Sequence, residues 1–312
     1  MQIVLVDPSR TVLKYVTRLL EARGHVVHGY GGGAEALAHL KSDEGVEALI
    51  TSAELVTMSG AELCWYARLL ASAARPLYVI LMSSLRDHHK VSEALDCGAD
   101  DFISKPPNAD ELCARLRAAE RVAAMQRELV RLATTDPLSG LFNRRAFFER
   151  GAAMVASAER ARGLAALLVD IDHFKRVNDA HGHDAGDEVI RRVAQEIAAL
   201  DGCAGRLGGE EFSVVLGGVA QDEAVAIADA LRLAIARREL ETTTGLIAPT
   251  CSIGVSAWRA GDTLDALLKR ADLALYEAKN SGRNRVVAFD STAHACGGEI
   301  PSSSIIRMAA RR

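Results

Sequence analysis

Over the first 120 residues, short apolar runs typical of strands alternate with longer segments in which apolar residues recur every three or four positions, as in amphipathic helices. A helix after every strand predicts an α/β fold with a doubly wound parallel sheet, covered on both faces. The expected strands are Ile3–Val6, Val26–Tyr30, Ala48–Thr51, Leu77–Met82 and Asp101–Ser104. Ligand-binding side chains gather where such strands end. The residues at those ends are Asp7, Ser52, Ser83 and Lys105.

Residues 110–134 lack proline and glycine and are rich in Ala, Leu, Arg and Glu, which predicts one continuous helix that overlaps the end of the first domain. Its apolar residues at alternating spacings of four and three are Ala118, Val122, Met125, Leu129 and Leu132. This is the seam of a left-handed coiled coil, so two such helices are able to pair. The alternative is that the seam packs against the chain's own domains.

The heptamer Arg206–Phe212 contains two adjacent glycines, which predict a tight hairpin turn with a positive φ and no side chain. Bare backbone of this kind lets a bulky ligand approach closely. Glu210 and Glu211 follow, and on a strand they would point to opposite faces, one of them toward a ligand. Taken alone, the heptamer also fits an ordinary hairpin with two solvated glutamates.

A second acidic cluster upstream favours a functional site. The apolar run Leu164–Val169 predicts a buried strand, which ends at Asp170-Ile171-Asp172 with both aspartates on one face. With Asp170 beside Glu210 on a neighbouring strand, the carboxylates would hold Mg²⁺, or Mn²⁺ as the alternative ion, together with a triphosphate.

The segment that follows carries groups suited to a nucleotide. Lys175 offers a point charge to phosphate, and backbone N–H groups around Phe174 add to it. Asn178 supplies an amide and Asp187 a carboxylate. Together they match guanine, because the carboxylate accepts hydrogen bonds from N1–H and N2–H₂ while the amide donates to N3 or O6.

The chain of 312 residues is long enough for two domains, and 49% hydrophobic and 25% charged residues are typical of a soluble globular protein. A formal net charge of -4 argues against nucleic acid as a partner. No stretch has the roughly 18 apolar residues of a membrane helix, and the N-terminus enters a strand without a leader, so we expect a cytoplasmic protein that does not bind membranes.

The six cysteines lack C-x-x-C spacing and are expected to be free thiols. For His173, His181 and His183, packing in turns is favoured over a zinc site, because no cysteine or i,i+4 partner accompanies them.

Residues 135–290 resemble a GGDEF-family diguanylate cyclase, whose signature here takes the G-G-E-E-F form, Gly208–Phe212. Other matching motifs, in family order, are Asp136–Leu138 with Asn143 and Arg144, Asp170–Lys175, Asn178 and Asp179, Gly182 and His183 with Gly186 and Asp187, and Tyr276–Lys279 with Gly282–Asn284. The resemblance implies an α+β palm-like nucleotide cyclase domain with a central antiparallel sheet. It also implies a homodimer, because each domain binds one GTP and the active site must be shared across a two-fold axis.

The resemblance also implies roles for individual residues. Asp170, Glu210 and the carbonyl of Ile171 would ligate the metal. Asn178 and Asp187 would bind guanine, and the phosphates would be held by Phe174, Lys175, Gly209, Lys279 and Arg283. The residues expected to take part in catalysis are Asp170, Lys175, Glu210 and Glu211. Glu211 would assist metal binding or deprotonate the ribose 3′-hydroxyl.

The implied reaction is attack of the 3′-oxygen of one GTP on the α-phosphorus of a second, carried out twice to give cyclic di-GMP and two pyrophosphates. One alternative is a catalytically silent module that binds GTP or cyclic di-GMP. The intact metal- and phosphate-binding positions argue against it. A second alternative is a cyclase with a different cyclic product, against which Asp187 argues because it suits guanine.

Residues 1–120 resemble a response-regulator receiver domain, which has a flavodoxin-like parallel sheet. The matching residues are Asp7, Met58–Gly60, Ser83 and Lys105 with Pro106. Ser52, however, stands where a receiver carries its phosphoryl-accepting aspartate, and Pro8 replaces the second member of the acidic pair. Serine is a poor acceptor near neutral pH, and proline cannot ligate Mg²⁺. We therefore expect a degenerate pseudo-receiver, with Asp7 and Lys105 as an ion pair, that dimerises or meets an upstream signalling protein.

One element of the cyclase family is missing. Its inhibitory product site, R-x-x-D, would begin nine positions before the first signature glycine, where Ala199–Gly202 reads Ala-Leu-Asp-Gly. Without the arginine there is no bidentate phosphate clamp, so weak or absent product inhibition by this route is expected. The small and polar residues 291–312 are expected to form a flexible tail.

Overall fold

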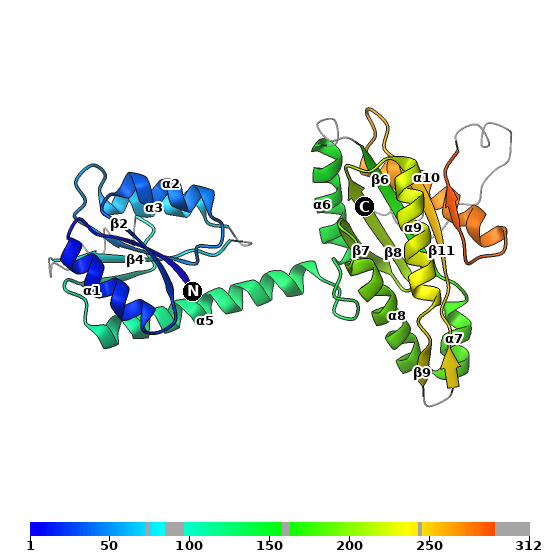
Figure 1. Cartoon of the computed structure of the whole chain (residues 1–312), viewed down its shortest axis with the longest axis horizontal. Coiled ribbons are helices and arrows are strands. Elements are labelled where there is room, and N and C mark those ends of the chain that lie inside the picture. The colour runs from blue at the N-terminus through cyan, green and yellow to red at the C-terminus, as the bar shows by residue number, and fades with distance from the viewer. Residues whose placement is uncertain (73–74, 85–96, 158–162, 243–244, 291–312) are drawn as a thin grey trace. The chain divides into compact units, whose positions relative to one another are not determined.

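The computed structural model describes residues 1–72, 75–84, 97–157, 163–242 and 245–290 (Figure 1). The chain forms two compact units, Met1–Arg131 (unit 1) and Leu132 onward (unit 2). The tail expected over residues 291–312 lies outside the described residues. No helix in the described part of the chain is long and apolar enough to cross a membrane.

Unit 1 is the predicted doubly wound parallel sheet. In chain order it contains β1 (Gln2–Val6), α1 (Arg10–Glu21), β2 (Val26–Tyr30), α2 (Gly33–Ser42), β3 (Ala48–Ser52), α3 (Gly60–Leu70), β4 (Tyr78–Ser83), β5 (Asp101–Ser104) and α5 (Ala109–Thr134), whose last residues reach into unit 2. The strand order β2-β1-β3-β4-β5 is that of flavodoxin-like folds. The helices α2 and α3 cover one face of the sheet, and α1 and α5 cover the other (Figure 1). Apolar side chains of each pair pack against the face that the pair covers.

The long helix α5 has two apolar faces. Leu112 and Leu116 are buried against the sheet of unit 1. The large apolar residues of the expected coiled-coil seam are instead exposed, by 49 to 67%. These residues are Val122, Met125, Leu129 and Leu132. The seam therefore remains available to a partner helix.

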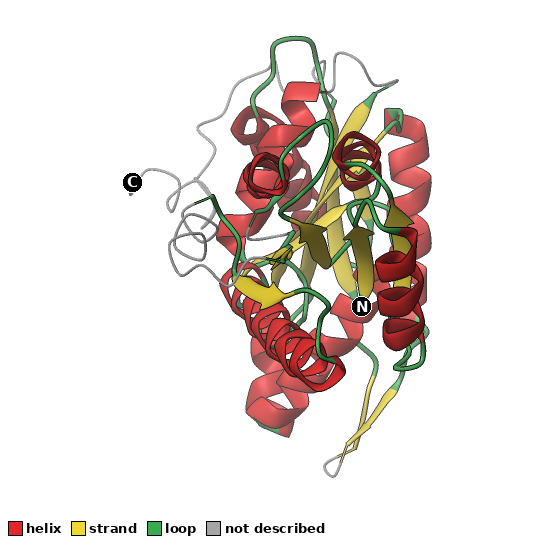
Figure 2. Cartoon of the chain, turned by 90° about the vertical axis from the view of Figure 1, so that its left-hand side faces the viewer, coloured by secondary structure: helices red, strands yellow, loops and turns green. Residues whose placement is uncertain are grey.

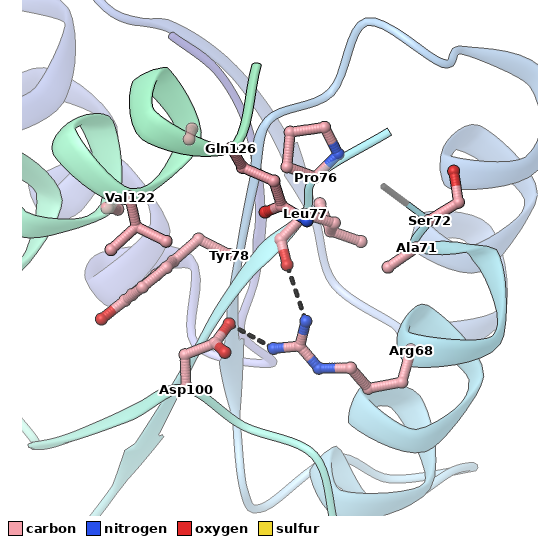
Figure 3. Close-up of a pocket in the computed structure, with 11 residues that line it drawn as sticks. Arg68, Ala71, Ser72, Pro76, Leu77, Tyr78, Asp100, Val122 and Gln126 are labelled. Atoms are coloured by element: carbon pink, nitrogen blue, oxygen red, sulfur yellow. Dashed lines mark hydrogen bonds and ion pairs between the residues drawn. The ribbon is translucent and has the colours of Figure 1, made fainter. Parts of the chain in front are cut away.

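A cavity of about 290 Å³ lies in unit 1 between α3, the start of β4 and α5 (Figure 3). Arg68 of α3 reaches across it and donates hydrogen bonds to the carbonyl oxygens of Leu77 (2.9 Å) and Gly98. Its remaining nitrogen pairs with the carboxylate of Asp100. Since each guanidinium nitrogen has a partner, Arg68 ties α3 to the residue before β4 and to the segment before β5.

Unit 2 has a mixed sheet with strand order β12-β11-β6-β8-β7, in which only β11 and β12 are parallel among the described strands. Its elements are α6 (Arg144–Ser157), β6 (Leu164–Ile171), α7 (Phe174–His181), α8 (His183–Ala198), β7 (Cys203–Gly208), β8 (Glu211–Gly217), α9 (Gln221–Ala236), β9 (Leu240–Thr242), β10 (Gly245–Ile247), β11 (Cys251–Ala257), α10 (Leu264–Asn280) and β12 (Val286–Ala288). The predicted antiparallel centre is confirmed. The parallel edge arises because α10 crosses over between β11 and β12.

The sheet of unit 2 is covered on both faces. Side chains of α6 and α10 pack on one face, and those of α8 and α9 pack on the other. The short β9–β10 ribbon projects beyond this sheet (Figure 2). The central strand β6 is buried along its whole length, so its carboxyl end provides a rigid support for functional side chains.

Candidate active site

The candidate site of unit 2 begins with Asp170, near the end of β6. Asp170 is buried, and in the sheet it lies opposite Glu211 of β8 on one side and Ser252 of β11 on the other. The expected strand neighbour of Asp170 was Glu210, whereas the residue paired with it in the sheet is Glu211.

The hairpin turn differs from the expectation. Gly208 pairs with Glu211, so the two-residue turn consists of Gly209, with φ of 50°, and Glu210. The prediction that both glycines form the turn and that Glu210 lies on the strand is wrong. The physical reason is the register of β7 against β8, because the pairing of Arg206 with Phe212 continues to Leu207 opposite Glu211 and so leaves Glu210 in the turn. An irregularity between Arg206 and Gly208 sets Gly208 opposite Glu211 instead and shortens the turn to two residues. Glu210 is consequently carried by a bend of the backbone, next to β6, where its carbonyl accepts a 3.4 Å hydrogen bond from the Ile171 N–H.

A partly buried arginine, to which the sequence analysis assigned no role, holds this turn. Arg206 donates two hydrogen bonds, of 2.9 and 2.7 Å, to the carbonyl oxygen of Gly209. Its third nitrogen lies 3.0 Å from Oδ1 of Asp136, which also accepts hydrogen bonds from the N–H and the hydroxyl of Ser139. Arg206 thereby joins the glycine turn to the Asp136–Ser139 turn at the start of unit 2.

The helix α10 brings Lys279 to the site. A Cβ atom on Gly254 of β11 would overlap the backbone of Ala271 and Leu275, so glycine lets α10 lie directly on the sheet. Lys279 Nζ lies 2.7 Å from Asp170 Oδ2, and the two side chains are 31% and 9% exposed. The lysine expected to bind phosphate is thus paired with the aspartate expected to bind metal.

The acidic end of β6 carries surplus negative charge. Burial raises the pKa of Asp170 to about 6, Lys279 opposes this rise, and the charges of Glu210 and Glu211 add to it. In the described part of the chain, no three Asp, Glu, His or Cys side chains form a ready-made metal cage. The expected ligands, two carboxylates and the Ile171 carbonyl, nevertheless fit Mg²⁺, which proteins usually hold through one or two carboxylates with substrate phosphates completing its shell.

The residues expected to bind guanine lie on a helix hairpin. The helices α7 and α8 meet at Gly182, which has φ of 83°. Asn178 of α7 points its Oδ1 at Gly186 of α8, where a Cβ atom would overlap it. This oxygen is buried and has no hydrogen-bond partner among the described residues. Asp187 is the next residue of α8, so the hairpin presents an amide and a carboxylate from facing helices.

The residues expected to bind phosphate surround the same end of unit 2. His173 is the N-cap residue of α7 and has φ of 55°. Within the described residues, its side chain accepts no hydrogen bond from the first N–H groups of the helix. The N–H groups of the Phe174 turn are therefore suited to an anion. Lys175 is exposed beside them. Arg283 follows α10 with φ of 61° and is also exposed.

Asp172 supports the loop that carries Arg283. It is buried and accepts hydrogen bonds from Ser252 Oγ (2.6 Å), Thr250 Oγ1 (2.8 Å) and the backbone N–H of Asn284 (3.0 Å). Sequence reasoning placed Asp172 on the same face as Asp170 but gave it no role. The signal available was its position two residues beyond a buried carboxylate.

In unit 1 the predicted residues also meet. Lys105 Nζ lies 2.7 Å from Asp7 Oδ2 and contacts Ser52 Oγ, and a cis peptide bond joins Lys105 to Pro106. Ser83 reaches the group through Glu54, a residue that the sequence did not indicate.

Comparisons with known proteins agree with this architecture. Residues 133–285 match the family model for the diguanylate cyclase GGDEF domain, and residues 3–117 match that for the response regulator receiver domain. Response regulator PleD of Caulobacter vibrioides is 40% identical over 229 residues, which cover 68% of this chain and 50% of PleD. Diguanylate cyclase DgcM of Escherichia coli is 38% identical over 173 residues, 53% of this chain and 40% of DgcM. The chain thus spans half or less of the length of these relatives.

A crystal structure of the coiled coil and GGDEF domain of DgcB from Caulobacter crescentus, in complex with c-di-GMP, is similar with a TM-score of 0.53. The sequences are 34% identical, and the match covers 57% of this chain and 97% of that one. Fold and sequence together define a receiver-like unit followed by a nucleotide cyclase domain. The chain belongs to the GGDEF diguanylate cyclase family.

Proposed function

We propose that this chain is a Mg²⁺-dependent diguanylate cyclase, which condenses two GTP into cyclic di-GMP and two pyrophosphates. The observation that carries the proposal is the meeting of Asp170, the Gly209–Glu210 turn and Lys279 at one end of the sheet. The relative DgcM and the matching family model are both named as diguanylate cyclases, which supports the same reaction for this chain.

Asp170, Glu210 and the Ile171 carbonyl would hold the ion, as argued from their oxygen donors. Bound Mg²⁺ would neutralise phosphate charge and lower the pKa of the attacking 3′-hydroxyl. When the triphosphate is present, the Lys279 ammonium would leave its ion pair with Asp170 and bind a phosphate oxygen instead. Lys175 and Arg283 would be further donors to the phosphates. Glu211, adjacent to Asp170 in the sheet, would accept the proton of the 3′-hydroxyl or support the ion.

Guanine would lie against the α7–α8 hairpin. A guanine ring would donate from N1–H and N2–H₂ to Asp187, and its N3 or O6 would accept a hydrogen bond from the amide nitrogen of Asn178. Asp187 suits the donor edge of guanine, so this pairing would contribute to binding and to the preference for GTP.

Each cyclase domain would contribute one GTP, so the active enzyme would be a homodimer. The exposed seam of α5 supports pairing of two chains through parallel helices. Unit 1 would act as a phosphorylation-independent pseudo-receiver that controls this pairing in the cytoplasm, in response to an upstream protein. Ala199–Gly202 lacks the charges of the product-binding element, so the product would not inhibit through it.

The test is incubation of the purified chain with GTP and Mg²⁺ at several protein concentrations, with products separated by chromatography. We expect cyclic di-GMP, formed at a rate that rises faster than linearly with protein concentration, and no product from ATP alone. Absence of cyclic di-GMP at every concentration, together with retained binding of GTP, would replace the proposal with a silent binding module.

A further inference from the structure

The pocket of unit 1 is filled by its own side chains. Ser52 is fully buried at the end of β3. Its Oγ accepts hydrogen bonds from the Glu54 N–H (3.0 Å) and from the Lys105 ammonium, and its proton is directed to Glu54, whose carbonyl lies 3.1 Å away. Both lone pairs of the hydroxyl are therefore engaged. Ser52 has no lone pair left to attack a phosphoryl donor.

The carboxylate of Glu54 folds back over this pocket. Its Oε1 accepts hydrogen bonds from the Ser83 hydroxyl (2.8 Å) and the Ser84 N–H (3.2 Å). Its Oε2 lies 3.4 Å from the Lys105 ammonium and 3.3 Å from Ser52 Oγ. A hydroxyl, a backbone N–H and an ammonium that converge on one anion form an oxyanion site.

The charges agree with this geometry. Burial raises the pKa of Glu54, but hydrogen bonds from Ser83 and Ser84 and the charge of Lys105 outweigh it and hold the pKa below its ordinary value. The Lys105 ammonium at the same time pairs with Asp7, so it lies between two carboxylates. A cation and an anion of the protein itself thus occupy the pocket.

We propose that Glu54 is an internal anion that occupies a latent oxyanion site of unit 1, formed by the Ser83 hydroxyl, the Ser84 N–H and the Lys105 ammonium. The site has the chemistry to bind a tetrahedral oxyanion of the phosphate class, and Glu54 excludes such an anion. Unit 1 is thereby held in its anion-bound arrangement without any phosphoryl donor. The inference concerns unit 1 alone and does not depend on the cyclase reaction.

Removal of the internal anion tests the proposal. In the full-length Trp258→Phe chain, Trp65 of α3 reports the melting of unit 1. We expect inorganic phosphate, at about ten times its dissociation constant, to raise the melting temperature of Glu54→Ala by about 5 °C. The unsubstituted Glu54 background and the matched control Glu44→Ala, an exposed glutamate of the same unit, should not respond.

Two further variants keep the test decisive. Adding Ser83→Ala to Glu54→Ala should abolish the phosphate response, because one of the three donors is lost. Should Glu54→Ala fail to fold, Glu54→Gln retains the shape and removes the charge, and it should respond to phosphate where the Glu54 background does not. An equal response of the Glu54 and Glu54→Ala proteins, a response that survives Ser83→Ala, or a phosphoryl group added to Ser52 by acetyl phosphate and Mg²⁺ would each overturn the proposal.

Discussion

Both units contain a buried aspartate paired with a lysine across the same 2.7 Å, Asp7 with Lys105 and Asp170 with Lys279. The surroundings of the two pairs differ. Lys105 is 12% exposed and is enclosed by further groups of unit 1, whereas Lys279 is 31% exposed and faces an acidic turn. The same pair of residue types is therefore enclosed in one unit and accessible in the other.

The comparison shows how charge balance distinguishes a closed pocket from a reactive one. In unit 1 the second carboxylate, Glu54, has its own donors in Ser83 and Ser84. In unit 2 burial raises the pKa of Asp170, the charges of Glu210 and Glu211 add to the rise, and only the Lys279 ammonium opposes it. Surplus negative charge of this kind favours the uptake of a divalent cation, which the enclosed pair does not need.

The largest expected effect on the cyclase reaction comes from removing the negative charge of the Asp170–Lys279 pair. Asp170→Asn should lower the rate of cyclic di-GMP formation about a thousandfold, because an oxygen ligand and its charge are lost where charge develops. The rate is measured at saturating GTP and Mg²⁺, and the exposed Asp222→Asn serves as the matched control in unit 2. A loss of less than tenfold would show that Asp170 is not part of the reacting centre.

The Asp7–Lys105 pair should contribute to the folding stability of unit 1. Asp7→Ala leaves the Lys105 ammonium in a buried site without its main partner, and we expect it to destabilise unit 1 by about 3 kcal/mol. Urea unfolding followed by Trp65 in the Trp258→Phe background measures this. The corresponding change Asp170→Ala, followed by Trp258 after Trp65→Phe, should cost less, because it relieves repulsion. Equal losses in the two units would contradict the contrast between the pairs.

Much of this arrangement was predictable from the sequence. Apolar periodicity located the strands of unit 1 to within about a residue, and the strand ends at Asp7 and Lys105 do meet. The family resemblance of unit 2 implied one site for Asp170 and Lys279, and these two side chains lie 2.7 Å apart. The role of Asn178 in binding guanine stays a prediction.

The remainder depends on register and on contacts between distant residues. The register of β7 against β8 leaves Glu210 in the turn, and a local irregularity sets Gly208 opposite Glu211. Such an irregularity leaves no mark in the hydrophobic pattern. Arg206 and Asp136 are 70 positions apart, so their ion pair exists only once the fold has formed. Glu54 resembles any exposed loop glutamate until Ser83 and Lys105 are brought to it.

Arg206 tests how far the acidic site depends on its support. Arg206→Lys keeps the charge but loses the fork that binds the Gly209 carbonyl and Asp136 together. We expect the turnover to fall about thirtyfold, since small displacements of positioned groups cost one to two orders of magnitude. Arg238→Lys, at an arginine 59% exposed, is the control. An unchanged turnover would mean that the turn holds its shape without Arg206.

The smallest expected effect is a dependence on pH that sets Glu54 apart from an ordinary surface glutamate. Its pKa is held below the ordinary 4.5, so the charged form stabilises the folded state above that pH and the contribution is lost as the pH falls through the lowered pKa. The melting temperature of unit 1 should therefore exceed that of Glu54→Ala by a constant amount from about pH 8 to about pH 5, and the difference should shrink below pH 4.5. Glu44→Ala should show no such difference at any pH. If the melting-temperature difference between the Glu54 protein and Glu54→Ala grew as the pH fell, the charged form of Glu54 would destabilise unit 1. The Lys105 ammonium would then be balanced by Asp7 alone.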